Sequence, residues 1–162
     1  MKMKLFSAVL LSTALLIGCG DEEGENADAE GCEHLQEGPV SSVNASASTS
    51  GAPAVNNDHR RYDITLTDVT GGKGGTVSFA AAEEAHYIIF SNADVPLAVR
   101  DANGQTVSAE ESVKSSSACT EIKGRHTFPM KVGTHTITFG PTTEDSVSIV
   151  IEEEAGEHDH EH

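Results

Sequence analysis

The last six residues of the chain alternate between acidic side chains and imidazoles, and they carry three of its eight histidines. The segment contains His158, His160 and His162, which are separated by Asp159 and Glu161. In an extended chain, imidazoles at this spacing can wrap around one divalent ion, and neutral imidazole suits zinc, copper or nickel. Such binding would weaken below about pH 6.5, where imidazoles protonate. The alternative interpretation is a solvated polar terminus without a metal.

Cys19 closes a segment with the features of a secretory signal. Lys2 and Lys4 precede an apolar stretch that is too short to span a bilayer of about 30 Å, and an abruptly polar segment follows it. The sequence Leu16-Ile17-Gly18-Cys19 resembles the lipobox of bacterial lipoproteins. The resemblance implies that residues 1–18 are a removed signal peptide and that acylated Cys19 anchors the protein in a lipid bilayer. The alternative is an ordinary signal peptide that ends at an unmodified cysteine.

The residue after the lipidated cysteine bears on the membrane that receives the protein. In enteric bacteria an Asp at this place favours retention in the inner membrane, whereas this chain has Gly20 there and Asp21 one residue later. The resemblance therefore implies a location in the cell envelope, with the outer membrane favoured over the inner membrane.

The other two cysteines, Cys32 and Cys119, can pair only with each other once Cys19 is acylated. Thiols tend to oxidise in an export compartment, so we expect a disulfide. It would close a loop of roughly 90 residues and contribute about 4 kcal/mol on the loop-entropy model. The competing interpretation is a zinc or copper site, because Glu33, His34 and Glu121 lie next to the two cysteines. Neither segment has the Cys-x-x-Cys spacing that is typical of such sites.

A disulfide between these segments predicts a second candidate metal site. It would bring His34 close to His126, which follows Cys119 by seven residues, and could place both imidazoles on one rim with Glu33 or Glu121. We expect the remaining internal histidines, His86 and His135, to lie on strand surfaces.

Motifs of the common catalytic sites are absent from the sequence. There is no Gly-x-Ser-x-Gly, no phosphate loop ending in Gly-Lys-Ser/Thr, and no His-Glu-x-x-His. The segment 71–75, Gly-Gly-Lys-Gly-Gly, lies between two expected strands, so it predicts a hairpin turn rather than a phosphate site. We therefore expect a protein that is not an enzyme and requires no cofactor, with zinc or copper as the possible ligands.

Composition excludes further classes of partner. The formal charge is -16 at pH 7 and becomes two units more negative when Lys2 and Lys4 leave with the signal peptide. Nucleic acid is therefore excluded as a partner, and close contact with anionic lipid is disfavoured. The chain has no Trp and few other aromatic residues, which weakens an assignment as a carbohydrate-binding protein.

The length of 162 residues predicts one folded domain with tails on either side. Residues 19–31 carry six acids and no large apolar side chain, so we expect a solvated, lipidated tether. We expect the domain itself over residues 32–152, with residues 32–59 partly irregular, and a disordered acidic tail with histidines over residues 153–162.

From Arg60 onward, apolar and polar residues alternate in short segments at intervals of roughly ten residues. Glycine-rich turns separate these segments. One of the expected strands covers residues 118–122. No helix is expected after the signal peptide. This rhythm predicts an all-β domain, a single antiparallel β-sandwich or jelly roll of about 7–9 strands.

Residues 62–152 are similar in strand rhythm to the β-sandwich modules of secreted bacterial proteins, such as pre-peptidase C-terminal-like domains. The hairpin end Val132-Gly133-Thr134-His135-Thr136-Ile137-Thr138-Phe139 contributes to the likeness. The resemblance implies a sandwich, which is a fold that hosts many activities. Our first hypothesis is a lipid-anchored, non-enzymatic structural or interaction module. The alternatives are a lipoprotein that binds or buffers zinc or copper and a module that binds carbohydrate or peptide.

Overall fold

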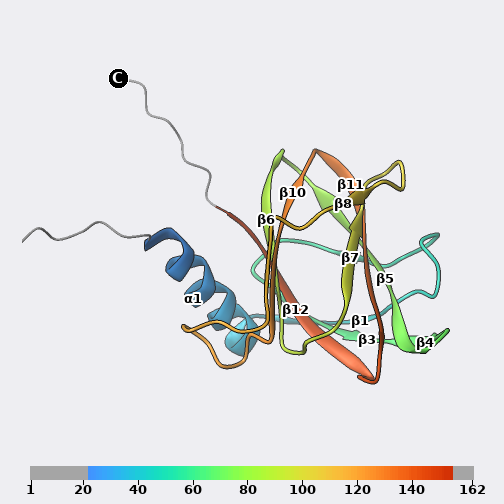
Figure 1. The fold of residues 1–162 in the computed structure, drawn as a ribbon, viewed down its shortest axis with the longest axis horizontal. Helices are drawn as coiled ribbons and strands as arrows, with labels where there is room; N and C mark the ends of the chain where they lie inside the picture. The colour runs from blue at the N-terminus through green and yellow to red at the C-terminus, as the bar shows by residue number, and fades with distance from the viewer. Residues whose placement is uncertain (1–21, 155–162) are drawn as a thin grey trace, which may run out of the picture.

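The computed structural model describes residues 22–154, and it is a β-sandwich with one helix (Figure 1). The helix, α1, spans Glu22–Glu37. One sheet, sheet A, consists in spatial order of β1 (Val40–Asn44), β3 (Arg61–Thr65), β12 (Ser146–Glu153), β6 (Ala85–Ser91), β10 (Gly124–Met130) and β9 (Glu111–Val113). The other, sheet B, consists of β2 (Ala54–Val55), β5 (Gly72–Ala81), β11 (Gly133–Thr142), β7 (Leu97–Arg100) and β8 (Thr106–Val107), with β4 (Thr67–Val69) paired to β5.

The expected sandwich is confirmed, although it is more finely divided than the sequence predicts. Twelve strands are present in the described residues instead of about 7–9, because several pairings involve only two or three residues. The sheets are mixed rather than purely antiparallel: β1 runs parallel to β3, and β2 runs parallel to β5. Both parallel partners belong to residues 32–59, for which the sequence predicts partly irregular structure.

The predicted glycine-rich hairpin exists, but its turn is earlier and its glycines belong to a strand. β4 and β5 form the hairpin, and the chain turns at Thr70 and Gly71. Gly74 and Gly75 lie within β5. Both positions require glycine because a Cβ would overlap a neighbouring segment: at Gly75 it would come within 2.7 Å of the Ala45 Cβ. The strand before the hairpin, β3, belongs to the opposite sheet, so the chain crosses the sandwich at Leu66.

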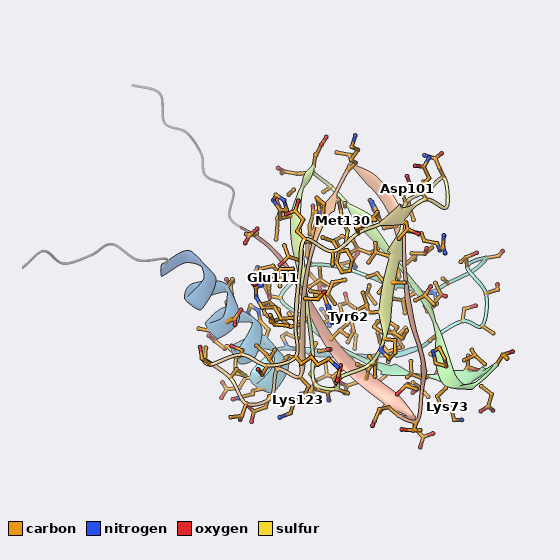
Figure 2. All side chains as sticks on the ribbon, viewed as in Figure 1. Tyr62, Lys73, Asp101, Glu111, Lys123 and Met130 are labelled. Carbon is orange, nitrogen blue, oxygen red and sulfur yellow. A yellow bond between two sulfur atoms is a disulfide. The ribbon has the colours of Figure 1, made fainter. Side chains whose placement is uncertain are left out.

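Apolar side chains fill the space between the two sheets and form the main core. Phe79 of β5 and Tyr87 of β6 face each other across it, with ring centroids 5.1 Å apart and the rings edge to face. Ile149 and Ile151 of β12 are completely buried in the same core. Tyr62 also lies inside the sandwich (Figure 2).

A second apolar cluster lies on the outer face of sheet A, beneath α1. Ile88, Phe90 and Val150 point outward from β6 and β12, since side chains alternate along a strand, and all three are completely buried. Leu35 of α1 packs on them together with residues of the loop 114–123. Figure 1 shows α1 beside the sandwich next to β6 and β12.

The helix corrects the expectation of a solvated tether over residues 19–31 and of no helix after the signal peptide. Ala27, Gly31 and Leu35 recur every four residues and form the stripe that faces sheet A. The prediction was wrong because it rested on the absence of large apolar side chains, whereas the close contact of α1 with sheet A requires small residues such as Ala27 and Gly31. A Cβ at Gly31 would come within 2.5 Å of the Phe90 ring. Cys19 and the rest of residues 1–21 lie outside the described residues.

Polar contacts at the edge of this cluster also hold α1 on the sheet. Arg125 of β10 is buried, and its Nε donates to Asp28 of α1 at 2.7 Å. Its Nη1 contacts Glu111, which lies on the side of sheet A that faces α1 (Figure 2). Ser116 donates to the other Asp28 carboxylate oxygen at 2.5 Å. This network holds the part of α1 around Asp28 against β10 and the loop 114–123.

The segment 118–122, for which the sequence predicts a strand, belongs instead to the irregular loop 114–123. Its apolar side chains, Cys119 and Ile122, are buried in the cluster beneath α1. The apolar residues of this segment contact a helix and do not belong to a sheet. The described part of the chain contains no helix long and apolar enough to cross a membrane.

Replacing Gly31 with alanine tests the close approach of α1. We expect Gly31→Ala to lower the free energy of unfolding by about 1–3 kcal/mol, because overpacking against the buried Phe90 ring outweighs the better helix propensity of alanine. Urea denaturation of the oxidised protein measures this change. In a Phe90→Ala background the same substitution is expected to be neutral or stabilising, since the atoms that a Cβ at residue 31 would overlap are gone. A Gly31→Ala protein more stable than the wild type would contradict the packing described.

Candidate functional site

Two histidines and two glutamates from three segments meet beside the C-terminal half of α1. Glu30 and His34 lie one turn apart on the helix, Glu152 lies on β12, and His59 lies in the loop between β2 and β3. One potential ligand atom from each of the four residues lies within 4.8 Å of those of the other three. We call these four residues the His34–His59 cluster.

Glu152 is the centre of the His34–His59 cluster. It points outward from β12, as Val150 does, and is only 5% exposed because α1 covers it. Its Oε1 lies 2.5 Å from His34 Nδ1, and its Oε2 lies 3.2 Å from His59 Nδ1. Burial raises the pKa of the Glu152 carboxyl, and the hydrogen bond with His34 opposes this effect. Each oxygen of the buried carboxyl group therefore faces an imidazole nitrogen.

His59 is held in an uncommon backbone conformation. Its φ is 55°, in the left-handed region that residues with a side chain seldom occupy. Tyr62 fixes the loop around it: its hydroxyl donates to Asp58 at 3.0 Å and accepts from the backbone N–H of Asn56 at 3.1 Å. The loop therefore presents the His59 imidazole to Glu152 at the expense of some backbone strain.

The cluster opens to solvent on the side of His59. The His59 side chain is 61% exposed, whereas that of His34 is 18% exposed. The two imidazole rings have centroids 4.8 Å apart and form one wall of an open pocket of about 290 Å³, which Glu37 and Asp58 also line. Glu30 adds a carboxylate oxygen 3.7 Å from His59 Nδ1. A small cation could therefore reach the buried carboxylate from solvent.

This set of donors suits a particular class of ion. Imidazole nitrogen with carboxylate oxygen is typical of zinc and copper sites, whereas calcium and magnesium prefer ligands that are all oxygen. Two histidines and one or two glutamates leave room for water in a four-coordinate or five-coordinate site. The residues present therefore fit a divalent transition-metal ion.

The predicted partnership of His34 with His126 is wrong, because sheet A separates the two side chains. His34 lies on the outer face with α1, whereas His126 pairs in register with Ile89, whose side chain belongs to the core between the sheets. His126 Nδ1 instead shares a hydrogen bond with Ser112 Oγ at 2.9 Å. Of the carboxylates predicted with them, Glu33 lines the pocket beside His34, and Glu121 lies near the disulfide.

The other internal histidines divide between surface and interior. His86 is half exposed, as predicted, and its Nε2 lies 2.9 Å from Glu110 Oε2. His135 was predicted to lie on a strand surface but is only 3% exposed, because it pairs with the buried Phe79 and faces the same core. The tail residues His158, His160 and His162 lie outside the described residues, so the tail site stays a prediction.

Three members of the cluster, Glu30, His59 and Glu152, were not predicted from the sequence. His59 is 25 residues from His34, and no spacing rule connects them. Glu152 did carry a signal: it follows three consecutive apolar residues of β12, which is typical of a strand buried on both faces. A carboxylate at the end of such a strand is a candidate for an unusual environment.

Cys32 and Cys119 form the expected disulfide, with their Cα atoms 5.7 Å apart. It links α1 to the loop 114–123 across 87 residues of sequence. In this state the sulfur atoms are bonded to each other and do not provide the thiolates that a metal site would need.

In comparison with known proteins, no family model matches the chain, and no curated protein matches it significantly. The resemblances to bacterial lipoproteins and to pre-peptidase C-terminal-like domains therefore stay predictions.

The partly buried position of His126 predicts a dependence of stability on pH. Burial lowers the pKa of His126 from its usual value of 6.5, and nearby Asp94 opposes this only in part. The unfolded chain therefore binds this proton more readily than the folded chain, so the full contribution to stability is present above about pH 6.5 and is lost as the pH falls through the lower, folded pKa.

We expect His126→Gln to reduce the fall in melting temperature between pH 7.5 and pH 5 relative to the wild type. Thermal unfolding followed by circular dichroism at several pH values measures this difference. An unchanged or steeper fall in the variant would show that His126 does not titrate as its burial indicates.

Proposed function

We propose that this protein is a lipid-anchored protein of the bacterial cell envelope that binds a divalent transition-metal ion, zinc or copper, without catalysing a reaction. The observation that supports metal binding most directly is the placement of Glu152. It is a carboxylate buried beneath a helix, and both of its oxygens face imidazoles.

The energetics of a buried carboxylate favour a cation at this place. Removing an ionised carboxylate from water is unfavourable unless a positive charge or several hydrogen bonds compensate. Here the nearest positive charges would be protons on His34 and His59. A divalent ion can replace those protons and contact both imidazole nitrogens and carboxylate oxygens at once. Metal and protons therefore compete for the same groups.

The surrounding charge also favours the capture of cations. The chain has a formal charge of -16, and Glu33, Glu37 and Asp58 line the pocket around His34 and His59. Such a surface raises the local concentration of divalent ions. We propose binding rather than catalysis because the sequence lacks recognised catalytic motifs, and the cluster can serve as a buffer or a carrier site.

A structural or interaction module without a metal is the alternative function. Among residues 22–154, the large apolar side chains with substantial exposure are Val40 and Val132, which come from different edges of the fold. A protein, peptide or glycan partner of this part of the chain would therefore meet a largely polar, acidic surface. Nothing in this surface favours one such partner over another.

The proposed lipid anchor, Cys19, comes directly before the folded part of the chain in the sequence. Cys19 precedes the first residue of α1, Glu22, by only three positions, so an acylated Cys19 would hold the folded domain close to the bilayer. With Gly20 after the cysteine, we place the protein in the outer membrane rather than the inner membrane.

The anchor is tested by metabolic labelling with a fatty-acid analogue, followed by membrane fractionation. We expect label on the wild-type protein and on a Cys119→Ala control, and none on Cys19→Ala. The labelled protein should sediment with the outer membrane. An unlabelled wild-type protein, or equal labelling of Cys19→Ala, would refute the anchor.

Calorimetric titration with zinc tests the metal site. A protein truncated after Glu154 removes the tail histidines and leaves the His34–His59 cluster intact. We expect this protein to bind one ion, and the double variant His34→Ala/His59→Ala to bind it at least tenfold more weakly, because two ligands are lost. His86→Ala serves as the matched control and should bind as the parent does.

Two outcomes would contradict the assignment. If the double variant binds zinc as tightly as the truncated parent, the cluster is not the site. If only the full-length protein binds, the tail histidines hold the ion and the cluster does not. Circular dichroism of each variant verifies that the sandwich is folded.

A further inference from the structure

The disulfide is accompanied by a carboxylate that a purely structural cross-link does not need. A Glu121 carboxylate oxygen and the sulfur atoms of Cys32 and Cys119 all lie within 4.8 Å of one another. The distance from Cys119 Sγ to Glu121 Oε2 is 3.5 Å. Thr120 donates its hydroxyl to the same oxygen at 3.0 Å, which orients the carboxylate toward the sulfur atoms.

This group is separate from the His34–His59 cluster, although both use α1. Cys32 lies midway between Glu30 and His34 in the sequence, and residues two positions apart point to different sides of a helix. Cys32 is directed toward the loop 114–123, whereas His34 is directed toward β12. An ion bound at the sulfur atoms can therefore be distinguished from an ion bound at the His34–His59 cluster.

We infer that reduction of the Cys32–Cys119 disulfide creates a second metal site, in which two thiolates and Glu121 bind a zinc-class ion or Cu(I). The inference goes beyond the proposed function and does not depend on it. In the oxidised protein the site does not exist. In the reduced protein it would link α1 to the loop 114–123 as the disulfide does.

The reduction balances as a thiol–disulfide exchange. A dithiol donor transfers two electrons and two protons to the disulfide, breaks the S–S bond and itself becomes a disulfide. The ion then displaces the two thiol protons and binds the resulting thiolates. Reoxidation by a disulfide or another two-electron oxidant reforms the S–S bond and releases the ion.

The backbone holds the Cα atoms of the two cysteines at a distance that also suits a two-thiolate metal site. Zinc–sulfur bonds of about 2.3 Å in a tetrahedral site place two thiolates about 3.8 Å apart. The Cα atoms of Cys32 and Cys119 are 5.7 Å apart, so rotation of the two side chains can supply that separation. Cys32 is only partly buried, and it is bonded to a residue of an irregular loop. A small dithiol can therefore reach it more readily than it could reach a sulfur atom in the main core.

Metal binding and reduction are linked thermodynamically. An ion that binds only the dithiol form stabilises that form, so it makes reduction easier, and oxidation in turn lowers affinity for the ion. An export compartment favours the disulfide as the resting state. The predicted behaviour is therefore retention of the ion under reducing conditions and its release on oxidation.

Cobalt(II) titration of the mature full-length protein tests the inference, because thiolate bound to cobalt gives an intense charge-transfer absorption in the near ultraviolet. We expect this band in protein reduced with a phosphine and no such band in oxidised protein. Reduced protein should also bind one additional equivalent of cobalt. This comparison needs no substitution, so it does not depend on whether cysteine variants fold.

Variants assign the ligands. Cys32→Ser and Cys119→Ser should each abolish the two-thiolate band, and Glu121→Gln should weaken cobalt binding at least tenfold. His34→Ala/His59→Ala should keep the band even if it loses the other ion. A reduced protein with no band and no additional equivalent would overturn the inference, and unchanged affinity in Glu121→Gln would overturn the three-ligand site.

Discussion

The outer face of sheet A must be covered, and most of the unusual features of this protein follow from that constraint. Ile88, Phe90 and Val150 point away from the core between the sheets, and none of them could remain exposed without a large loss of stability. Helix α1 covers them. The close contact requires Gly31 opposite Phe90, and it explains why a segment of acidic and small residues is helical.

The docked helix also brings together the two groups of potential metal ligands. It brings Glu30 and His34 to β12 and buries Glu152, which would otherwise be an ordinary acid at the end of a strand. It presents Cys32 to Cys119 and Asp28 to Arg125. An apolar contact, a covalent bond and a buried ion pair thus hold one helix on the sheet, and two groups of potential metal ligands lie along that helix. Conditions that loosen α1 should therefore affect both.

The fold class was predictable because strand alternation is a local property of the sequence. Tyr62 and Ile64 alternate with polar residues, and β3 forms there as expected. The helix was not predictable in the same way, since Ala27 and Gly31 gain their role only opposite Phe90. The prediction of a strand at residues 118–122 was wrong for the converse reason: the apolar side chains of this segment pack under α1 and not in a strand. The parallel pairings of β1 and β2 depend on contacts distant in sequence, which periodicity does not report.

The sequence by itself determined the sandwich, because strand periodicity is a local property, and it predicted the disulfide between Cys32 and Cys119 on the expectation that Cys19 is acylated. It also predicts a signal peptide and lipidation at Cys19, which lie outside the described residues. Only the tertiary structure decided which histidines meet. It placed His34 with His59 and Glu152 on the outer face, and it left His126 on the inner face of the same sheet. The physical reason is that a metal site requires side chains from separate segments to point toward one place. Their directions depend on how α1, β12 and the loop around His59 pack.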